Sequence, residues 1–246
     1  MAETKFPGVY VEELPAKVRP IEGVPTSTAV FLGTGPRDIA PTLLTSFSEF
    51  LQAAGEDAPG FLPLAVRGFF DNGGQRCYIT LSTASDPVAA GLDALAAIQF
   101  SMLCCPDEHQ LHEAAGQLVA WAERRKDIVC VLQSPPPPIP DESHAPPARS
   151  SYAAYYYPWV VVGEPDGVEI SMPPGGHVCG VYARVDVERG VHVAPADICL
   201  HGVRRLTHVV DAAASNALAS RGINVLRHVP GRGFVVWGAR TTTTQG

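Results

Sequence analysis

The sequence predicts an α/β fold with a mixed, largely parallel sheet flanked by helices and preceded by an extended N-terminal arm. Between residues 77 and 132, short apolar runs alternate with segments of helical periodicity. This β-α-β-α-β order implies parallel strands joined by right-handed crossovers. Hydrophobic residues make up 46% of the 246 residues and charged residues only 17%, so surface is buried in a core or against neighbours.

Shifts in composition divide the chain into four regions. Residues 1–23 form the arm, residues 24–133 an α/β region, and residues 151–246 a second core region with a short polar tail. Residues 134–150 are a proline-rich loop, which is too poor in N–H donors for a central strand. The loop is interpreted as a stiff surface connection, or alternatively as a ligand for a proline-reading partner.

The arm has few ways to fold by itself. Pro7, Pro15 and Pro20 exclude a long helix. Residues 9–11 (Val-Tyr-Val) form a β-prone run with no partner nearby in the sequence. This run is either a frayed terminus or a strand that pairs with the sheet edge of another subunit.

The first core strand is predicted at residues 28–33. The turn that follows, Gly33-Thr34-Gly35-Pro36, does not match a dinucleotide fingerprint. Asp38 stands where the third glycine belongs, and Pro36 interrupts the start of a helix. No cofactor site is therefore predicted here.

Helix and strand signals then alternate. Ser46 and Glu49 have the spacing of a capping box before a short helix. Residues 62–70 form a second helix, which residues 72–74 (Asn-Gly-Gly) end through a left-handed cap. Residues 77–81 read as a buried strand.

The next helices are longer. Residues 87–98 predict an amphipathic helix and residues 108–126 another, with strands at 100–105 and 128–132. Asp107 and Glu108 are expected in a solvated first turn, where acidic groups favour the helix dipole.

The second core region begins with a β-branched and aromatic run. Residues 155–162 predict one buried strand, and residues 173–190 a loop leading into a helix whose surface carries Arg184, Asp186, Glu188 and Arg189. An alanine-rich helix is expected at residues 209–219.

The chain closes with a predicted strand–turn–strand at residues 223–226 and 234–237. The Pro-Gly-Arg-Gly turn between them favours a positive φ at Gly231 and Gly233. Residues 241–246 are polar and are expected to fray.

No motif predicts a metal or a cofactor. His109 and His112 are spaced i, i+3 with Glu113 after them, whereas a zincin helix needs histidines at i and i+4 around the glutamate. The six cysteines have apolar neighbours and no CxxC spacing, so buried reduced thiols are predicted. They are Cys77, Cys104, Cys105, Cys130, Cys179 and Cys199.

Charge argues against a nucleic-acid partner. The formal net charge is −7, whereas a nucleic-acid coat needs a basic face. Tyr155, Tyr156 and Tyr157 are therefore interpreted as core residues rather than a stacking platform. The sequence contains no apolar run long enough for a membrane span and no signal-peptide core. The chain is expected to be made in the cytoplasm.

Two arginines flank glycine turns near the end of the chain. Arg232 and Arg240 could bind phosphate, although such arginines more often clamp neighbouring carboxylates. No pairing of a nucleophile with a base is evident. An enzyme or ligand-binding α/β domain is kept as the alternative class.

Several long motifs carry a family resemblance. They are an opening Pro-Gly-Val-Tyr-Val-Glu-Glu (residues 7–13), a Tyr-Tyr-Pro-Trp run (156–159), the block from Pro173 to Ala196, and the block from Gly222 to Thr241. Residues 24–33 and 69–74 match too. Together they resemble the contractile tail sheath proteins of phages and related injection machines.

The resemblance implies a structural role in a virion tail or a cytoplasmic injection-system particle. Sheath subunits stack as six-fold rings around a tail tube and are joined by extended arms. The implied partners are other copies of the chain and a tail tube protein, with a longer sheath protein and a baseplate as further candidates. The implied subunit-contact residues are Pro7, Val9, Tyr10, Val11, Glu12, Arg184, Arg189, Arg232 and Arg240.

Two features depart from the family pattern. His192 and Val193 stand where sheath proteins keep Trp-Lys, which changes a contact rather than the fold. Sheath chains also continue past the Gly-Ala-Arg-Thr motif to a C-terminal arm. The expectation is that this chain makes rings or short stacks, or depends on a longer sheath partner.

Overall fold

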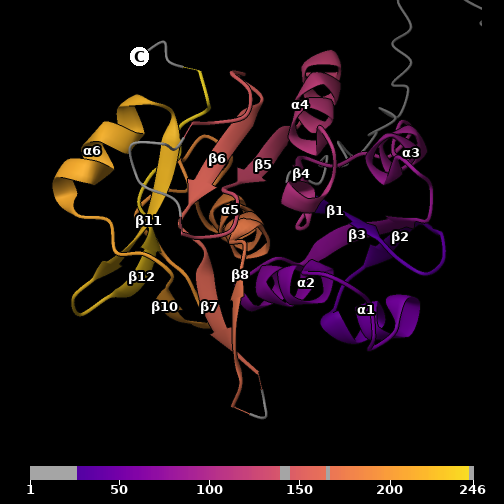
Figure 1. The fold of residues 1–246 in the computed structure, drawn as a ribbon, viewed down its shortest axis with the longest axis horizontal. Helices are drawn as coiled ribbons and strands as arrows, with labels where there is room; N and C mark the ends of the chain where they lie inside the picture. Colours follow the sequence, from indigo (N-terminus) through magenta and orange to yellow (C-terminus); the bar gives the residue numbers. More distant parts are fainter. Residues whose placement is uncertain (1–26, 139–144, 165–166, 244–246) are drawn as a thin grey trace, which may run out of the picture.

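The computed structural model describes residues 27–138, 145–164 and 167–243. The predicted N-terminal arm lies outside these residues. Two sheets form the framework, one of nine strands and one of three. Figure 1 shows the large sheet running through the molecule with helices on both sides.

The centre of the large sheet is parallel, as predicted. In the order β3-β1-β4-β5-β6-β11, each strand pairs in parallel with the next. Antiparallel strands complete the two sides, with β2 beyond β3, and β12 followed by β9 beyond β11. The bounds are β1 Thr28–Thr34, β2 Ile39–Leu44, β3 Arg76–Ser82, β4 Met102–Cys104, β5 Val129–Gln133, β6 Ala153–Tyr157, β9 Ile198–Cys199, β11 Ile223–Val229 and β12 Gly233–Val236.

Pro158 divides the strand that was predicted at residues 155–162. Strand β6 ends at Tyr157 in the large sheet, and β7 (Val160–Gly163) belongs to the small sheet. The prediction of one strand is wrong because proline lacks the N–H that a central ladder needs. The small sheet has the antiparallel order β10-β7-β8, with β10 at Val203–Leu206 and β8 at Glu169–Met172.

Helices cover both faces of the large sheet and create two hydrophobic cores. One core contains α1 (Phe47–Ala54), α2 (Leu62–Asp71) and α5 (Gly175–Arg189). The other contains α3 (Pro87–Ala94), α4 (Ala114–Arg125) and α6 (Ala212–Ser220). Because successive strand residues face opposite sides, Tyr156 enters the first core and Tyr155 and Tyr157 the second. The prediction that these tyrosines are core residues is confirmed.

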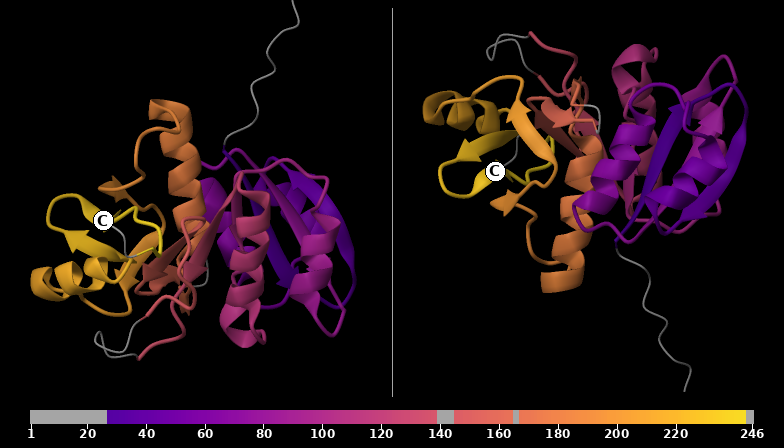
Figure 2. Two further views of the ribbon diagram at one scale, coloured as in Figure 1. Left: turned by 90° about the horizontal axis from the view of Figure 1, so that it is seen from above. Right: turned by 90° about the horizontal axis from the view of Figure 1, so that it is seen from below.

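Helix α5 occupies a central position. Both views in Figure 2 place it between the N-terminal elements and the yellow C-terminal elements. Residues around most of its circumference are buried, including Val178, Val181 and Val185. Sequence patterning predicted a helix here with a charged surface, but Arg184 and Asp186 are half-buried because α5 has neighbours on several sides.

Three predicted helices have different bounds. The helix predicted at 108–126 is a 3-10 turn (η1, Glu108–Gln110) followed by α4, because Glu113 adopts a left-handed conformation between them. Helix α6 begins only at Ala212, where the Asp211 carboxylate accepts a 2.7 Å hydrogen bond from the Ala214 N–H and caps the helix. Helix α3 ends at Ala94, earlier than predicted.

The predictions of positive φ in the glycine turns are confirmed, whereas the prediction of a frayed tail is wrong in part. Gly73, Gly231 and Gly233 have φ values of 101°, 78° and 89°. The tail prediction is wrong for Thr242, whose N–H donates a 2.8 Å hydrogen bond to the Ala153 carbonyl. Its hydroxyl accepts a 2.9 Å hydrogen bond from the Ser150 N–H, so this part of the tail is held against β6.

Candidate functional site

Glycines bring α2 and α5 into unusually close contact. A Cβ atom on Gly176 would overlap the Ala65 backbone, and one on Gly180 would overlap the Phe69 carbonyl. On α2, a Cβ on Gly68 would lie 2.5 Å from the His177 ring. Only glycine permits this approach, so the Pro-Pro-Gly-Gly-His sequence at the start of α5 specifies a tight helix crossing.

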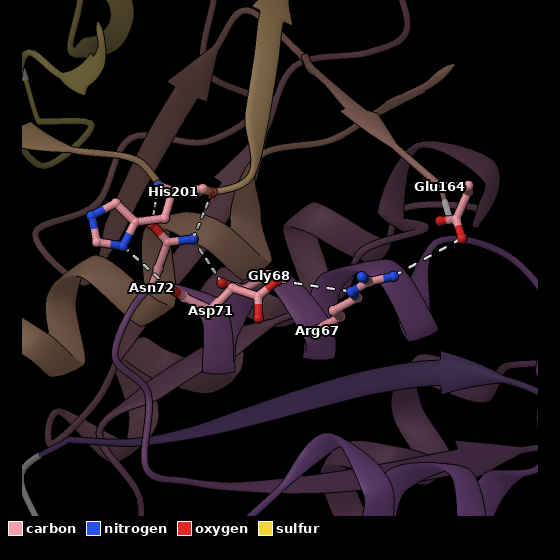
Figure 3. Close-up of polar contacts among 6 residues, drawn as sticks. All are labelled: Arg67, Gly68, Asp71, Asn72, Glu164 and His201. Carbon is pink, nitrogen blue, oxygen red and sulfur yellow. Dashed lines mark hydrogen bonds and ion pairs between the residues drawn. The ribbon is translucent and has the colours of Figure 1, made fainter. Parts of the chain in front are cut away.

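Asn72 joins the end of α2 to the loop between β9 and β10. Its side-chain oxygen accepts a 2.8 Å hydrogen bond from the His201 N–H. Its amide donates to the Gly68 carbonyl at 2.9 Å and to the His201 carbonyl at 3.2 Å. Figure 3 shows these contacts beside Asp71, whose carbonyl lies 3.3 Å from the His201 ring. The buried asparagine therefore connects segments that are distant in the sequence.

Arg67 provides a second, weaker connection. Its guanidinium lies 3.8 Å from the Asp71 carboxylate and 4.0 Å from that of Glu164, which follows β7 (Figure 3). The Arg67 and Asp71 side chains are well exposed, so these pairs contribute little to stability. The charged groups of Arg67, Asp71 and Glu164 line a small cavity.

The cavity has a volume of about 70 Å³ and lies between α2, α5 and the small sheet. Its wall includes Gly68, Val162, His177 and Gly202. His177 is buried, and its Nδ1 has no hydrogen-bond partner. Burial lowers the pKa of His177 to about 4. A neutral imidazole wedged against Gly68 suits a structural role in the crossing better than proton transfer.

The strand order of the large sheet reverses at β1. From β1, the chain adds β3 on one side and then crosses to add β4 on the other. In α/β proteins, ligands bind beyond the carboxyl ends of strands at such a point. Here that position contains Asp107, whose carboxylate accepts hydrogen bonds from the Phe61 N–H at 3.0 and 3.1 Å. The chain's own groups thus occupy the expected ligand position.

Neighbouring polar groups are also paired with the chain itself. The Gln133 N–H donates a 2.6 Å hydrogen bond to Glu108, and the Gln133 side-chain oxygen accepts from the Gly175 N–H at 2.7 Å. Burial raises the pKa of Glu108 to about 8 and also raises that of Asp107. The prediction that Asp107 and Glu108 lie in a solvated helical turn is wrong, since both are buried.

The four arginines predicted as contact residues have different surroundings. Arg232 donates a 2.7 Å hydrogen bond to Asp197, which confirms the carboxylate clamp. Arg240 instead donates to the Ala219 carbonyl at 3.3 Å, so the clamp prediction is wrong there. Arg184 turns inward to the Cys199 carbonyl, and Arg189 is exposed at the end of α5. Their role in subunit contact stays a prediction, and Pro7, Val9, Tyr10, Val11 and Glu12 lie outside the described residues.

One surface feature was missed by sequence reasoning. A groove of about 600 Å³ opens between β10, the start of α6 and the β11–β12 hairpin, and we call it the β10–β12 groove. Val209, at its border, is 80% exposed. The helical pattern that begins at Val209 concealed this exposure, because the Asp211 cap delays the helix by three residues.

The described part of the chain offers little for metal or membrane binding. Among these residues, no group of histidine, cysteine or acidic side chains has the arrangement of a metal site. No helix within the described ranges is long and apolar enough to cross a bilayer. All six cysteines are free, and five are buried while Cys199 is partly exposed.

The comparisons with known proteins agree on one family. Residues 83–242 match the family model of the phage tail sheath protein central domain. A chain of the helical sheath of the anti-feeding prophage in the contracted state is 30% identical, with a TM-score of 0.74. A chain of the baseplate of the same system is 28% identical, with a TM-score of 0.76. Each match covers 99% of this chain and 70% of the other.

More distant structures share the fold alone. The sheath tail protein Lin1278 from Listeria innocua is 10% identical with a TM-score of 0.64, over 89% of this chain and 69% of that one. No curated protein sequence matched the chain. The family model covers well over half of the sequence. The chain therefore belongs to the phage tail sheath protein family.

Proposed function

We propose that this sheath-family structural subunit assembles with further copies of itself around a tail tube in a phage or phage-like injection system. The observation that carries the proposal is the 30% identity, over 99% of the chain, to a subunit of a helical sheath. A baseplate is a second partner that the comparisons suggest, because a baseplate chain matches equally well.

The architecture suits a subunit that moves as one body in a changing lattice. Glycine contacts hold α2 against α5, and Asn72 ties α2 to the loop before β10. These connections join α2, in the first third of the chain, to α5 and the loop before β10, in its last third. A lattice rearrangement would then be taken up between subunits and in the connecting arms.

We propose that the connection between subunits uses the arm, with residues 9–11 pairing as an added strand. Extended segments gain main-chain hydrogen bonds at a free sheet edge. Arg189 and Arg232 are proposed as further contacts because both are exposed. An enzymatic alternative has less support, since Asp107 and Phe61 occupy the expected ligand crevice.

The test is the particle mass of the purified full-length chain by multi-angle light scattering. Serine at positions 9, 10 and 11 removes the β-prone side chains while keeping the length of the arm. We expect assemblies in the parent and a large loss of mass in the triple variant. Val168→Ser, at another exposed apolar position, is the control and should assemble normally. Equal masses in the parent and the triple variant would refute the role of the arm.

A further inference from the structure

Two adjoining hollows lie at the start of α4. The first has a volume of about 610 Å³ and extends from η1 to Pro147, and the second has a volume of about 470 Å³ and extends to the start of α3. Leu111, Glu113 and Gln117 line both hollows, so the two are continuous along one side of α4. We call them together the α4 trough.

The walls of the α4 trough are largely aliphatic. In the first hollow they include Leu111, Ala114, Ala115 and Pro147, and the second hollow adds Val88. Methylene groups gain about 25 cal/mol for each Å² that such a surface removes from water. The trough is therefore better suited to an aliphatic chain than to a compact hydrated ion.

Acidic side chains are spaced along these walls. Glu108 lines the first hollow, Asp86 lines the second, and Glu113 lines both. Among the described residues, no lysine or arginine lines either hollow. His112 lines the second hollow and lies 4.0 Å from the Glu113 carboxylate. The trough thus offers carboxylates at separate points and no lysine or arginine to neutralise them.

Glu108 supplies the observation that points to a ligand. It is only 6% exposed, and its Oε1 accepts the 2.6 Å hydrogen bond from the Gln133 N–H. Its Oε2 has no hydrogen-bond partner within the described part of the chain, and neither has the side-chain oxygen of Gln117. A buried polar atom without a partner costs stability. Both oxygens are therefore acceptors that a bound N–H donor would satisfy.

The free acceptors favour an ammonium group over a guanidinium. A guanidinium binds a carboxylate best through two parallel N–H bonds, which need both carboxylate oxygens. Because Gln133 already occupies Oε1 of Glu108, only one oxygen remains. An ammonium group is compact and has three rotatable donors, so it can use a single oxygen and turn its other donors to further acceptors in the trough.

We propose that the α4 trough binds a linear aliphatic diamine or polyamine. One ammonium group contacts Glu108, a second lies near Glu113 or Asp86, and the methylene chain between them packs along Leu111. Two charges are needed because the carboxylates stand at separate points along an aliphatic wall. This binding role does not depend on the assembly proposed above, and its failure would leave that proposal intact.

The ionisation of Glu108 sets the conditions of the test. Burial raises the pKa of Glu108 to about 8, so the empty site is largely neutral at pH 7. At about pH 8.5 the carboxyl group is mostly ionised, whereas a primary alkylammonium keeps its proton because its pKa resembles that of lysine, about 10.4. The ligand and its main partner are then both charged.

Isothermal titration calorimetry of the full-length chain with 1,5-diaminopentane, at about pH 8.5 in about 0.15 M NaCl, tests the site. We expect one saturable site per chain. Pentylamine, which has the same chain length and one charge, should bind about fivefold more weakly because it lacks the second ion pair. Equal affinities of the two amines would overturn the assignment of a diamine, and absence of saturable binding would overturn the site.

Glu108→Gln removes the charge while keeping the size of the side chain. It should weaken binding of the diamine by about tenfold or more, because a buried ammonium loses its charged partner. Glu123→Gln makes the same change of charge on the exposed surface of α4, outside the trough, and should bind as the parent does. Equal affinities of the parent and Glu108→Gln would overturn the contact with Glu108.

A second pair of variants tests the location independently of Glu108. Gly116 lines the first hollow, and a Cβ atom at this position would meet open space. Gly116→Lys brings a tethered ammonium group to the trough and should weaken binding of the diamine by about tenfold through like-charge repulsion. Gly116→Ala is the matched control and should bind as the parent does. Unchanged binding in Gly116→Lys would place the diamine elsewhere and overturn the proposal.

Discussion

The His201 N–H donates a 2.8 Å hydrogen bond to the side-chain oxygen of Asn72, a residue 129 positions earlier in the chain. Asn72 is fully buried and uses both its oxygen and its amide in this contact region. A hydrogen bond between such distant segments forms only when both halves of the fold have docked. It therefore reports directly on the integrity of the subunit.

Replacing Asn72 with alanine should destabilise the fold by about 2–4 kcal/mol, because the His201 N–H and the buried Gly68 carbonyl lose their side-chain partner. Urea denaturation at neutral pH measures this. The matched control is Asn216→Ala in the exposed face of α6, which should change stability by less than about 0.5 kcal/mol. Equal losses in both variants would show that the connection is not important for stability.

Replacing glycine with alanine should change the stability in opposite directions at two helical positions, one in the α2–α5 crossing and one in an open part of α4. Gly176→Ala should destabilise by about 1–3 kcal/mol or more, because the new methyl group meets the Ala65 backbone, which has little freedom to shift. Gly116→Ala, in an open position of α4, should stabilise by about 0.5–1 kcal/mol through helix propensity. Thermal melting distinguishes the two. A stabilising Gly176→Ala would mean that the helices can separate at little cost.

Sequence patterning succeeded where one local signal decides the structure. The alternation of apolar runs and helical segments predicted the parallel sheet, and glycine spacing predicted positive φ at Gly231 and Gly233. It failed where distant groups decide. Glu108 was assigned to a solvated turn because nothing local reveals that Gln133 and the sheet bury it.

The same distinction applies to the site. Buried cysteines and core tyrosines follow from composition and context. The prediction is confirmed for the tyrosines and for five of the six cysteines, and it is wrong for Cys199, which is partly exposed. The Asn72–His201 hydrogen bonds and the β10–β12 groove arise from tertiary docking. Asn72 was interpreted only as part of a helix cap, since its spacing to Gly73 is local while its partner is not.

His177 predicts a loss of stability in acid. Its pKa is about 4 in the folded protein and near 6.5 when exposed, so the unfolded chain binds a proton more readily. The contribution of His177 to stability should therefore fall as pH drops below 6.5, by roughly 3 kcal/mol at pH 4. The groups that face the cavity with it are Arg67, Asp71 and Glu164.

The measurement is the difference between the pH–stability curves of the parent and His177→Asn, which cannot be protonated in this range. As pH falls from 7 to 4, the stability of the parent should fall relative to that of His177→Asn. His112→Asn, at an exposed histidine, is the control and should keep the parent's curve. Parallel curves for the parent and His177→Asn would show that burial does not lower the pKa of His177.

Glu108 predicts the opposite slope. Because burial raises its pKa from 4.5 to about 8, the folded state retains a proton that the unfolded state releases. Its contribution therefore weakens as pH rises from about 4.5 towards 8. Glu108→Gln, which stays neutral, should gain stability relative to the parent between pH 5 and 8, measured by urea midpoints. Exposed Glu113→Gln should show no such gain.

Negative-stain electron microscopy of the purified full-length chain, with the particle mass checked by light scattering, tests whether the protein assembles as a sheath subunit. We expect rings or short stacks with six-fold symmetry, which depend on residues 9–11. Particles with the mass of a single chain at every concentration, alone and after mixing with a tail tube protein, would contradict this expectation.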